Sequence, residues 1–120
     1  MANPVAWFEI VGKDGDSLRK FYGDLFDWPI ESSDGDMDYG LVAPQPSGIG
    51  GGIGRSSDGG AGHVTFYVEV DDPAAYLRKA EKLGGKVAVP PMEIPNYNLT
   101  FAFFSDPEGH LIGLSKGAVQ

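Results

Sequence analysis

The residues best suited to chemistry fall in two short runs of the chain, each with strand-like character. Glu9 supplies a carboxylate, and His63 supplies an imidazole, the side chain most often used as a general acid or base. Trp7 and Tyr67 supply aromatic surface, which binds planar or cationic molecules by stacking. A few aromatic and polar groups of this kind are typical of a small-molecule pocket, in which Glu9 or His63 is a candidate general base.

Both runs alternate between two sets of side chains, as strands do. The apolar set is expected to pack beneath helices and comprises Ala6, Phe8, Ile10, Val64, Phe66, Val68 and Val70. The other set is mixed and comprises Trp7, Glu9, His63, Thr65 and Tyr67. A sheet covered by helices on one face can leave its other face to a ligand. We therefore expect the mixed set to line a cleft.

Each run is followed by a predicted helix. In the first helix, residues 17–28, apolar side chains recur on one face, with Asp16 or Ser17 as the expected N-cap. That face comprises Leu18, Phe21, Tyr22, Leu25 and Phe26. The second helix is expected to have Asp72 as its N-cap, Pro73 at its first position and the pair at 84–85, both glycine, at its end.

The two halves of the chain repeat at an offset of 58 residues, which superposes Asp14 on Asp72 and Trp7 on Thr65. After each predicted helix come three short strand-like runs, at 28–31, 39–43 and 49–53 and again at 86–89, 99–104 and 111–114. Each half therefore reads β-α-β-β-β. The expected organisation is one α+β domain over 1–120, with module one at 1–57 and module two at 58–120.

Composition narrows the classes of partner. The net charge of −8 disfavours nucleic acid and anionic membranes, which require a basic surface. Neither a membrane-spanning run nor a signal peptide is evident, so we expect a cytoplasmic location and no membrane partner. The chain contains no cysteine, which excludes disulfides, thiolate metal sites and a cysteine nucleophile. The expected partner is a small molecule.

Three stretches together resemble the vicinal oxygen chelate superfamily of glyoxalases, bleomycin-resistance proteins and extradiol dioxygenases. They are "FYGDLFDW", "YVEVDDPAAYLRKAEKLGGKV" and the closing "FSDPEGHLIGL", in which His110 stands where the superfamily commonly has asparagine. The resemblance spans nearly the whole chain. It implies two βαβββ modules whose mixed sheet curls around a central cleft with the helices outside, and it implies a homodimer.

The superfamily's metal-dependent members hold a divalent ion with His, Gln or Glu side chains from the first and last strands of each module. Carried over to this chain, the first-strand places fall on Trp7 and on Thr65, or on His63 in another alignment. The last-strand places fall on Gly113 and near residues 53–55. Tryptophan and glycine offer no ligand atom, so we expect no metal and no other cofactor. An improvised metal site of His63 with Glu9 stays an alternative.

The leading functional hypothesis is a metal-independent protein that binds an aromatic or cationic small molecule in the cleft. The site then comprises Trp7, Glu9, His63, Thr65, Tyr67 and Gly113, with Tyr97 as a lid residue. The first alternative is a metal-free isomerase, cyclase or lyase that uses Glu9 or His63 as its base. A metal-dependent glyoxalase or dioxygenase, and a small dimeric module of a larger complex, are the remaining alternatives.

Overall fold

The computed structural model describes residues 2–32, 38–94 and 98–117, and within it the chain forms two compact units. The N-terminal unit is Trp7–Val64, and the C-terminal unit combines Met1–Ala6 with Thr65–Gln120. The chain passes from one unit to the other within its first and fifth strands. Among the described residues no helix is long and apolar enough to cross a membrane.

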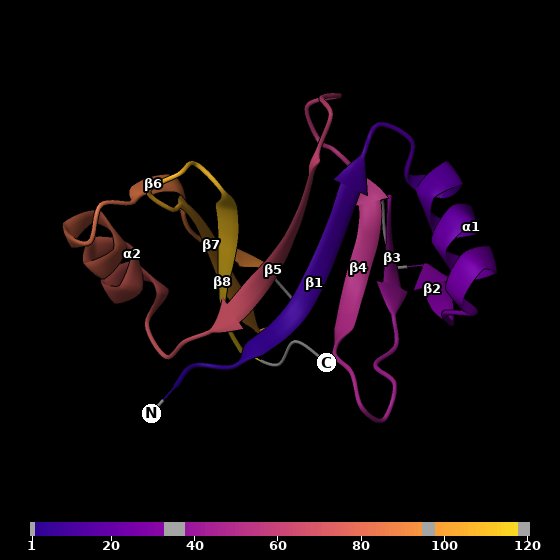
Figure 1. Cartoon of the computed structure of the whole chain (residues 1–120), viewed down its shortest axis with the longest axis horizontal. Coiled ribbons are helices and arrows are strands. Elements are labelled where there is room, and N and C mark those ends of the chain that lie inside the picture. The colour runs from indigo at the N-terminus through magenta and orange to yellow at the C-terminus, as the bar shows by residue number, and fades with distance from the viewer. Residues whose placement is uncertain (1, 33–37, 95–97, 118–120) are drawn as a thin grey trace. The chain divides into compact units, whose positions relative to one another are not determined.

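The N-terminal unit has one helix beside four strands (Figure 1). Its elements are β1 (Val5–Gly12), α1 (Gly15–Phe26), β2 (Ile30–Ser32), β3 (Tyr39–Val42) and β4 (Gly50–Arg55). Strand β4 pairs in parallel with β1 and antiparallel with β3, and β3 pairs antiparallel with β2. Strand β4 thus lies between β1 and β3, and it brings the side chains of these two strands close together.

The C-terminal unit repeats the same order of elements. They are β5 (His63–Glu69), α2 (Pro73–Lys82), β6 (Lys86–Ile94), β7 (Leu99–Ser105) and β8 (Leu111–Lys116). The first two residues of β5, His63 and Val64, belong to the N-terminal unit. Strand β8 pairs in parallel with β5 and antiparallel with β7, which pairs antiparallel with β6. The βαβββ order predicted for each half is therefore confirmed, whereas the curl and the central cleft concern both units together and stay predictions.

The helix starts follow local capping chemistry. Asp72 caps α2 by accepting from the backbone N–H of Ala75, and Pro73 takes the first helical position, as predicted. The prediction for α1 was wrong by two residues. Its N-cap is Asp14, whose carboxylate accepts from the backbone N–H of Ser17 at 3.0 Å. An extended Asp14 and a helical start at Gly15 place Asp16 inside the first turn, where it no longer caps.

The core of the C-terminal unit only partly follows the predicted faces. Val70, Leu77, Ala102 and Leu114 form its buried cluster. Val64 and Phe66, expected beneath a helix, are 77% and 39% exposed. Helix α2 packs on β6, β7 and β8, so the start of β5 is not the surface that it covers. The alternation identified two faces of β5 but not the one that the helix would bury.

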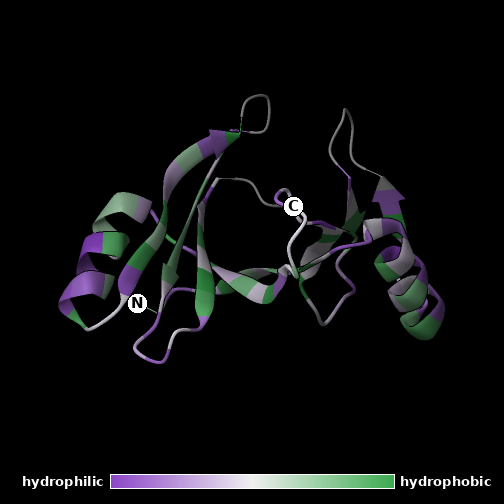
Figure 2. Cartoon of the chain, turned by 90° about the horizontal axis from the view of Figure 1, so that it is seen from above, coloured by the Kyte–Doolittle hydropathy of each residue, from purple (hydrophilic) through white to green (hydrophobic). Residues whose placement is uncertain are grey.

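Helix α1 also leaves much of its apolar face uncovered. Phe21, Leu25 and Phe26 are each more than half exposed. Their neighbour Trp28 packs against Phe26 and Phe8, with ring centroids 5.1 and 5.3 Å apart. Figure 2 shows hydrophobic and hydrophilic bands alternating along both helices, as their amphipathic sequences predict.

Candidate functional site

A glycine-rich strand creates the space for a group of polar side chains in the N-terminal unit. In β4, Gly50, Gly52 and Gly54 alternate and so share one face. The side chain of Tyr39, from β3, lies across this bare face. A Cβ atom built on Gly52 would stand 1.8 Å from the Tyr39 hydroxyl oxygen and 1.9 Å from its ring carbon Cζ. The glycine is therefore required for the close approach of Tyr39.

Tyr39 reaches over β4 to side chains of β1. The indole N–H of Trp7 donates to the Tyr39 hydroxyl at 3.2 Å, and that hydroxyl donates to Glu9 Oε1 at 2.8 Å. The other carboxylate oxygen, Glu9 Oε2, lies 2.7 Å from His63 Nε2. We call Trp7, Glu9, Tyr39 and His63 the Glu9 network. Its four side chains are linked by three hydrogen bonds within one unit.

Burial distinguishes the members of the Glu9 network. Trp7 and Glu9 are 9% and 8% exposed, whereas the His63 side chain is 27% exposed. A buried carboxylate is costly unless it is hydrogen-bonded, and each oxygen of Glu9 has a partner, Tyr39 at Oε1 and His63 at Oε2. Trp7 and Glu9 are thus the buried members, whereas His63 and Tyr39 are partly exposed.

The environment keeps Tyr39 as a hydrogen-bond donor. The pKa of Tyr39 is raised far above its usual range. Burial of the phenol is the largest cause, and the nearby charge of Glu9 is the second. The phenol therefore stays protonated throughout the physiological range and continues to donate to Glu9. Because Tyr39 accepts from Trp7 at the same time, its ring and hydroxyl are held in one orientation.

The C-terminal unit holds the other predicted residues. Thr65 donates its hydroxyl to the backbone carbonyl of Leu111 at 2.5 Å. The ring of Tyr67 fills the space beside Gly113, where an added Cβ atom would lie 2.4 Å from ring carbon Cδ2. Tyr67 also packs against Phe103, with ring centroids 5.3 Å apart. The missing side chain at Gly113 is thus a space that an aromatic ring occupies.

The structure brings together Trp7, Glu9 and His63 of the predicted site and adds Tyr39, which the sequence analysis missed. Alternate glycines opposite a tyrosine were the available signal, because they leave one strand face bare. Thr65, Tyr67 and Gly113 lie in the other unit, and a shared cleft between the two groups stays a prediction. The predicted lid residue Tyr97 lies outside the described residues.

The strand register identifies the places that correspond to the superfamily's last-strand metal ligands. Glu9 pairs with Gly52 and Tyr67 pairs with Gly113, and Glu9 and Tyr67 are related by the 58-residue repeat. By this register the matching place in module one is Gly52, beside the predicted place near residues 53–55. The sequence analysis had no register from which to choose between neighbouring residues of β4.

The side chains at these places do not fit the superfamily's divalent metal. The Trp7 indole can only donate, and it donates to Tyr39. Thr65 donates to a carbonyl, and the two glycines are covered by tyrosine rings. Within residues 2–32, 38–94 and 98–117, no cluster of three His, Cys, Asp or Glu side chains is placed to hold a metal ion.

Comparison with known proteins agrees with the repeated βαβββ order. Residues 5–114 match the family described as the glyoxalase, bleomycin resistance protein and dioxygenase superfamily. The chain belongs to this superfamily. Membership confirms the resemblance drawn from the sequence and accounts for the repeat of strand, helix and three strands.

Two curated relatives in the superfamily are similar over nearly all of this chain. "Putative glyoxylase CFP32" of Mycobacterium tuberculosis is 28% identical over 116 residues, which are 95% of this chain and 44% of the relative. "Anthracycline biosynthesis protein DnrV" of Streptomyces peucetius is 28% identical over 131 residues, covering 96% of this chain and 47% of the relative. The chain thus spans less than half the length of these relatives.

Solved structures show the same fold. Methylmalonyl-CoA epimerase from Mycobacterium tuberculosis superposes with a TM-score of 0.70 at 16% identity, covering 95% of this chain and 87% of that one. A superfamily member from Vibrio splendidus gives a TM-score of 0.64 at 13% identity, covering 96% and 99% of the two chains. At these identities the likeness establishes the α+β fold alone.

Proposed function

We propose that this chain is a metal-independent superfamily member that binds a small carbonyl compound and moves a proton on it with His63. The observation that carries the proposal is the Glu9 carboxylate shared between the Tyr39 hydroxyl and His63 Nε2. A carboxylate that is fixed on one side orients an imidazole on the other, and an oriented imidazole is an effective general base. Glu9 is then a positioning residue.

The hydrogen bond to Glu9 indicates which nitrogen of His63 carries the hydrogen and which one acts as the base. A carboxylate accepts hydrogen bonds, so the hydrogen of a neutral imidazole lies on Nε2 and its lone pair on Nδ1. His63 Nδ1 takes a proton from the carbon next to the substrate carbonyl, and the C–H electron pair forms an enolate. Return of a proton to that enolate completes an exchange or an isomerisation. His63 passes through the imidazolium, which the neighbouring Glu9 stabilises.

The proposal that the site works without a metal is supported by its donor set. The places of the superfamily's metal ligands hold Trp7, Thr65, Gly52 and Gly113. The two side chains donate hydrogen bonds within the protein, and tyrosine rings fill the space beside the two glycines. The relatives' names indicate ligand classes worth testing. One relative is named a putative glyoxylase and the other an anthracycline biosynthesis protein, so we include small carbonyl compounds and a planar aromatic compound in the test.

The test is deuterium exchange in D2O, followed by proton NMR. The panel comprises the glutathione hemithioacetal of methylglyoxal, simple 1,3-diketones and the anthracycline aglycone daunomycinone. We expect the protein to accelerate exchange of the proton next to the carbonyl in at least one class. His63→Ala should remove the acceleration, and His110→Ala should retain it, because His110 contacts Asp106 on an exposed turn. Exchange that persists in His63→Ala would remove His63 from the mechanism.

Binding without chemistry is the second candidate. Both carboxylate oxygens of Glu9 are engaged inside the protein, which a purely structural network also requires. In that case daunomycinone would bind saturably and quench tryptophan fluorescence with no exchange by any compound of the panel. Trp7→Phe would reduce the quenching if the ligand lies against the Glu9 network.

A further inference from the structure

A surface hollow of about 570 Å³ opens at one end of the N-terminal unit. It lies where β1 and β4 end and β3 begins, and its lining includes Lys13, Asp38, Tyr39, Arg55 and Ser57. Tyr39 belongs to both the hollow and the Glu9 network. The hollow is therefore a place from which a bound molecule contacts the network.

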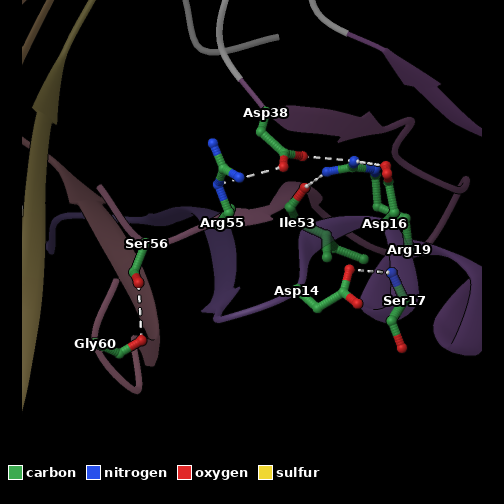
Figure 3. Close-up of polar contacts among 9 residues, drawn as sticks. All are labelled: Asp14, Asp16, Ser17, Arg19, Asp38, Ile53, Arg55, Ser56 and Gly60. Carbon is green, nitrogen blue, oxygen red and sulfur yellow. Dashed lines mark hydrogen bonds and ion pairs between the residues drawn. The ribbon is translucent and has the colours of Figure 1, made fainter. Parts of the chain in front are cut away.

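The charges around the hollow are arranged unevenly. Asp38 accepts from Arg19 at 2.6 Å, and Arg19 also binds Asp16 and the carbonyl of Ile53 at 3.1 Å (Figure 3). Arg19 is thereby shared between two carboxylates, those of Asp16 and Asp38. Arg55 stands on the opposite side of the Asp38 carboxylate and forms an ion pair with it, with Nε 3.6 Å from Asp38 Oδ2 (Figure 3).

Two cationic side chains, Lys13 and Arg55, line the hollow. Arg55 is 61% exposed, and Lys13 lies at the exposed turn after β1. The chain as a whole has 17 acidic and nine basic residues, whereas the residues that line the hollow include two basic ones, Lys13 and Arg55, and one acidic one, Asp38. Such a place attracts an anion that the rest of the surface repels.

We infer that the hollow binds an anionic group, a carboxylate or a phosphate, through Lys13 and Arg55. Arginine offers a planar fork of donors to such a group, and lysine adds a point charge. The inference rests on the proposed function in one respect: it makes this anion part of the substrate, whose carbonyl end extends past Tyr39 toward Glu9 and His63. The substrate class is then a carbonyl compound with an acidic tail.

The segment that connects Arg55 to His63 supports a substrate that extends from the hollow to the Glu9 network. Arg55 ends β4, and the next segment passes through Gly59, which also lines the hollow, to His63. Ser56 holds this segment by donating its hydroxyl to the carbonyl of Gly60 at 2.8 Å (Figure 3). The cationic end of the hollow and the proposed base are thus the two ends of one short, internally bonded segment.

The test uses the whole chain and inorganic phosphate, with acetate as a second arm, followed by titration of amide NMR signals. We expect shifts at Lys13, Arg55 and Ser57, and a dissociation constant about tenfold weaker in Arg55→Gln, the loss of one charge-assisted contact. Lys13→Gln should weaken binding in the same direction. Lys20→Gln is the matched control, because Lys20 is exposed, pairs with Asp24 and lies outside the hollow.

The outcomes separate this inference from the proposed function. Phosphate binding that is unaltered in Arg55→Gln, or amide shifts confined to other surfaces, would overturn the anion site. Binding as expected without deuterium exchange by any compound would leave the anion site intact and contradict the proton transfer. Stronger binding of phosphate than of acetate assigns a phosphorylated tail, and the reverse assigns a carboxylic acid.

Discussion

Glu9→Gln is expected to lower the rate of proton exchange by about 10²–10⁴-fold, the usual contribution of an oriented general base. Glu9 accepts at both oxygens, from Tyr39 and at His63 Nε2. Glutamine has one acceptor oxygen and one donor amide group. If its oxygen serves Tyr39, its amide faces His63 Nε2 and favours the tautomer whose hydrogen lies on Nδ1. The shape of the site is kept while the base is lost.

The measurement is the exchange rate of whichever compound the wild-type chain accelerates, with Glu31→Gln as control. Glu31 is an exposed glutamate on β2 of the same unit, so its neutralisation changes the net charge equally and leaves the network untouched. We expect the Glu31→Gln rate to stay near that of the wild type. Equal rates in all three proteins would show that Glu9 does not position the base.

Gly52→Ala is expected to lower the free energy of unfolding by about 1–3 kcal/mol, the typical cost of overpacking a close-packed site. The new methyl group would lie 1.8 Å from the Tyr39 hydroxyl, so the ring must move away. Replacing glycine in a strand stabilises by roughly 0.5–1 kcal/mol, which is too little to offset the clash. Movement of Tyr39 also leaves the Trp7 indole and Glu9 without their shared partner.

Urea unfolding followed by tryptophan fluorescence measures this effect. Gly48→Ala is the matched control, because a Cβ atom at Gly48 meets no atom within 4 Å and its backbone is not in the left-handed region. Its stability should stay within about 0.5 kcal/mol of the wild type, as for most surface substitutions. A Gly52→Ala protein as stable as Gly48→Ala would show that Tyr39 does not lie across Gly52.

Local chemistry predicted the ends of α2 well. Asp72, Pro73 and Gly84 act through hydrogen bonds and backbone angles within a few residues, so their effects can be read from the chain. Period-two alternation likewise separated Trp7 and Glu9 from Phe8. It could not reveal which face is buried, because that depends on where a helix packs. Val64, exposed although apolar, shows the consequence.

Predicting the Glu9 network requires the order of the strands in the sheet as well as their positions in the chain. Tyr39 is 30 residues from Glu9, and the two meet only because β4 lies between their strands and carries glycine at the crossing point. In the C-terminal unit a ring also covers a glycine, but it comes from the parallel neighbour: Tyr67 of β5 covers its register partner Gly113 of β8. Gly113, which the sequence suggested as a ligand place without a side chain, is therefore a place where a neighbouring aromatic ring lies against the strand.

The most direct test of the account is the position of the hydrogen on the neutral His63 imidazole, which long-range nitrogen–proton NMR correlation spectra reveal without any substrate. Glu9 Oε2 lies 2.7 Å from His63 Nε2 and can only accept there while it is ionised. We predict that the hydrogen is on Nε2, with Nδ1 as the basic nitrogen. A hydrogen on Nδ1 would contradict the account, because Glu9 would then not orient His63 for proton transfer.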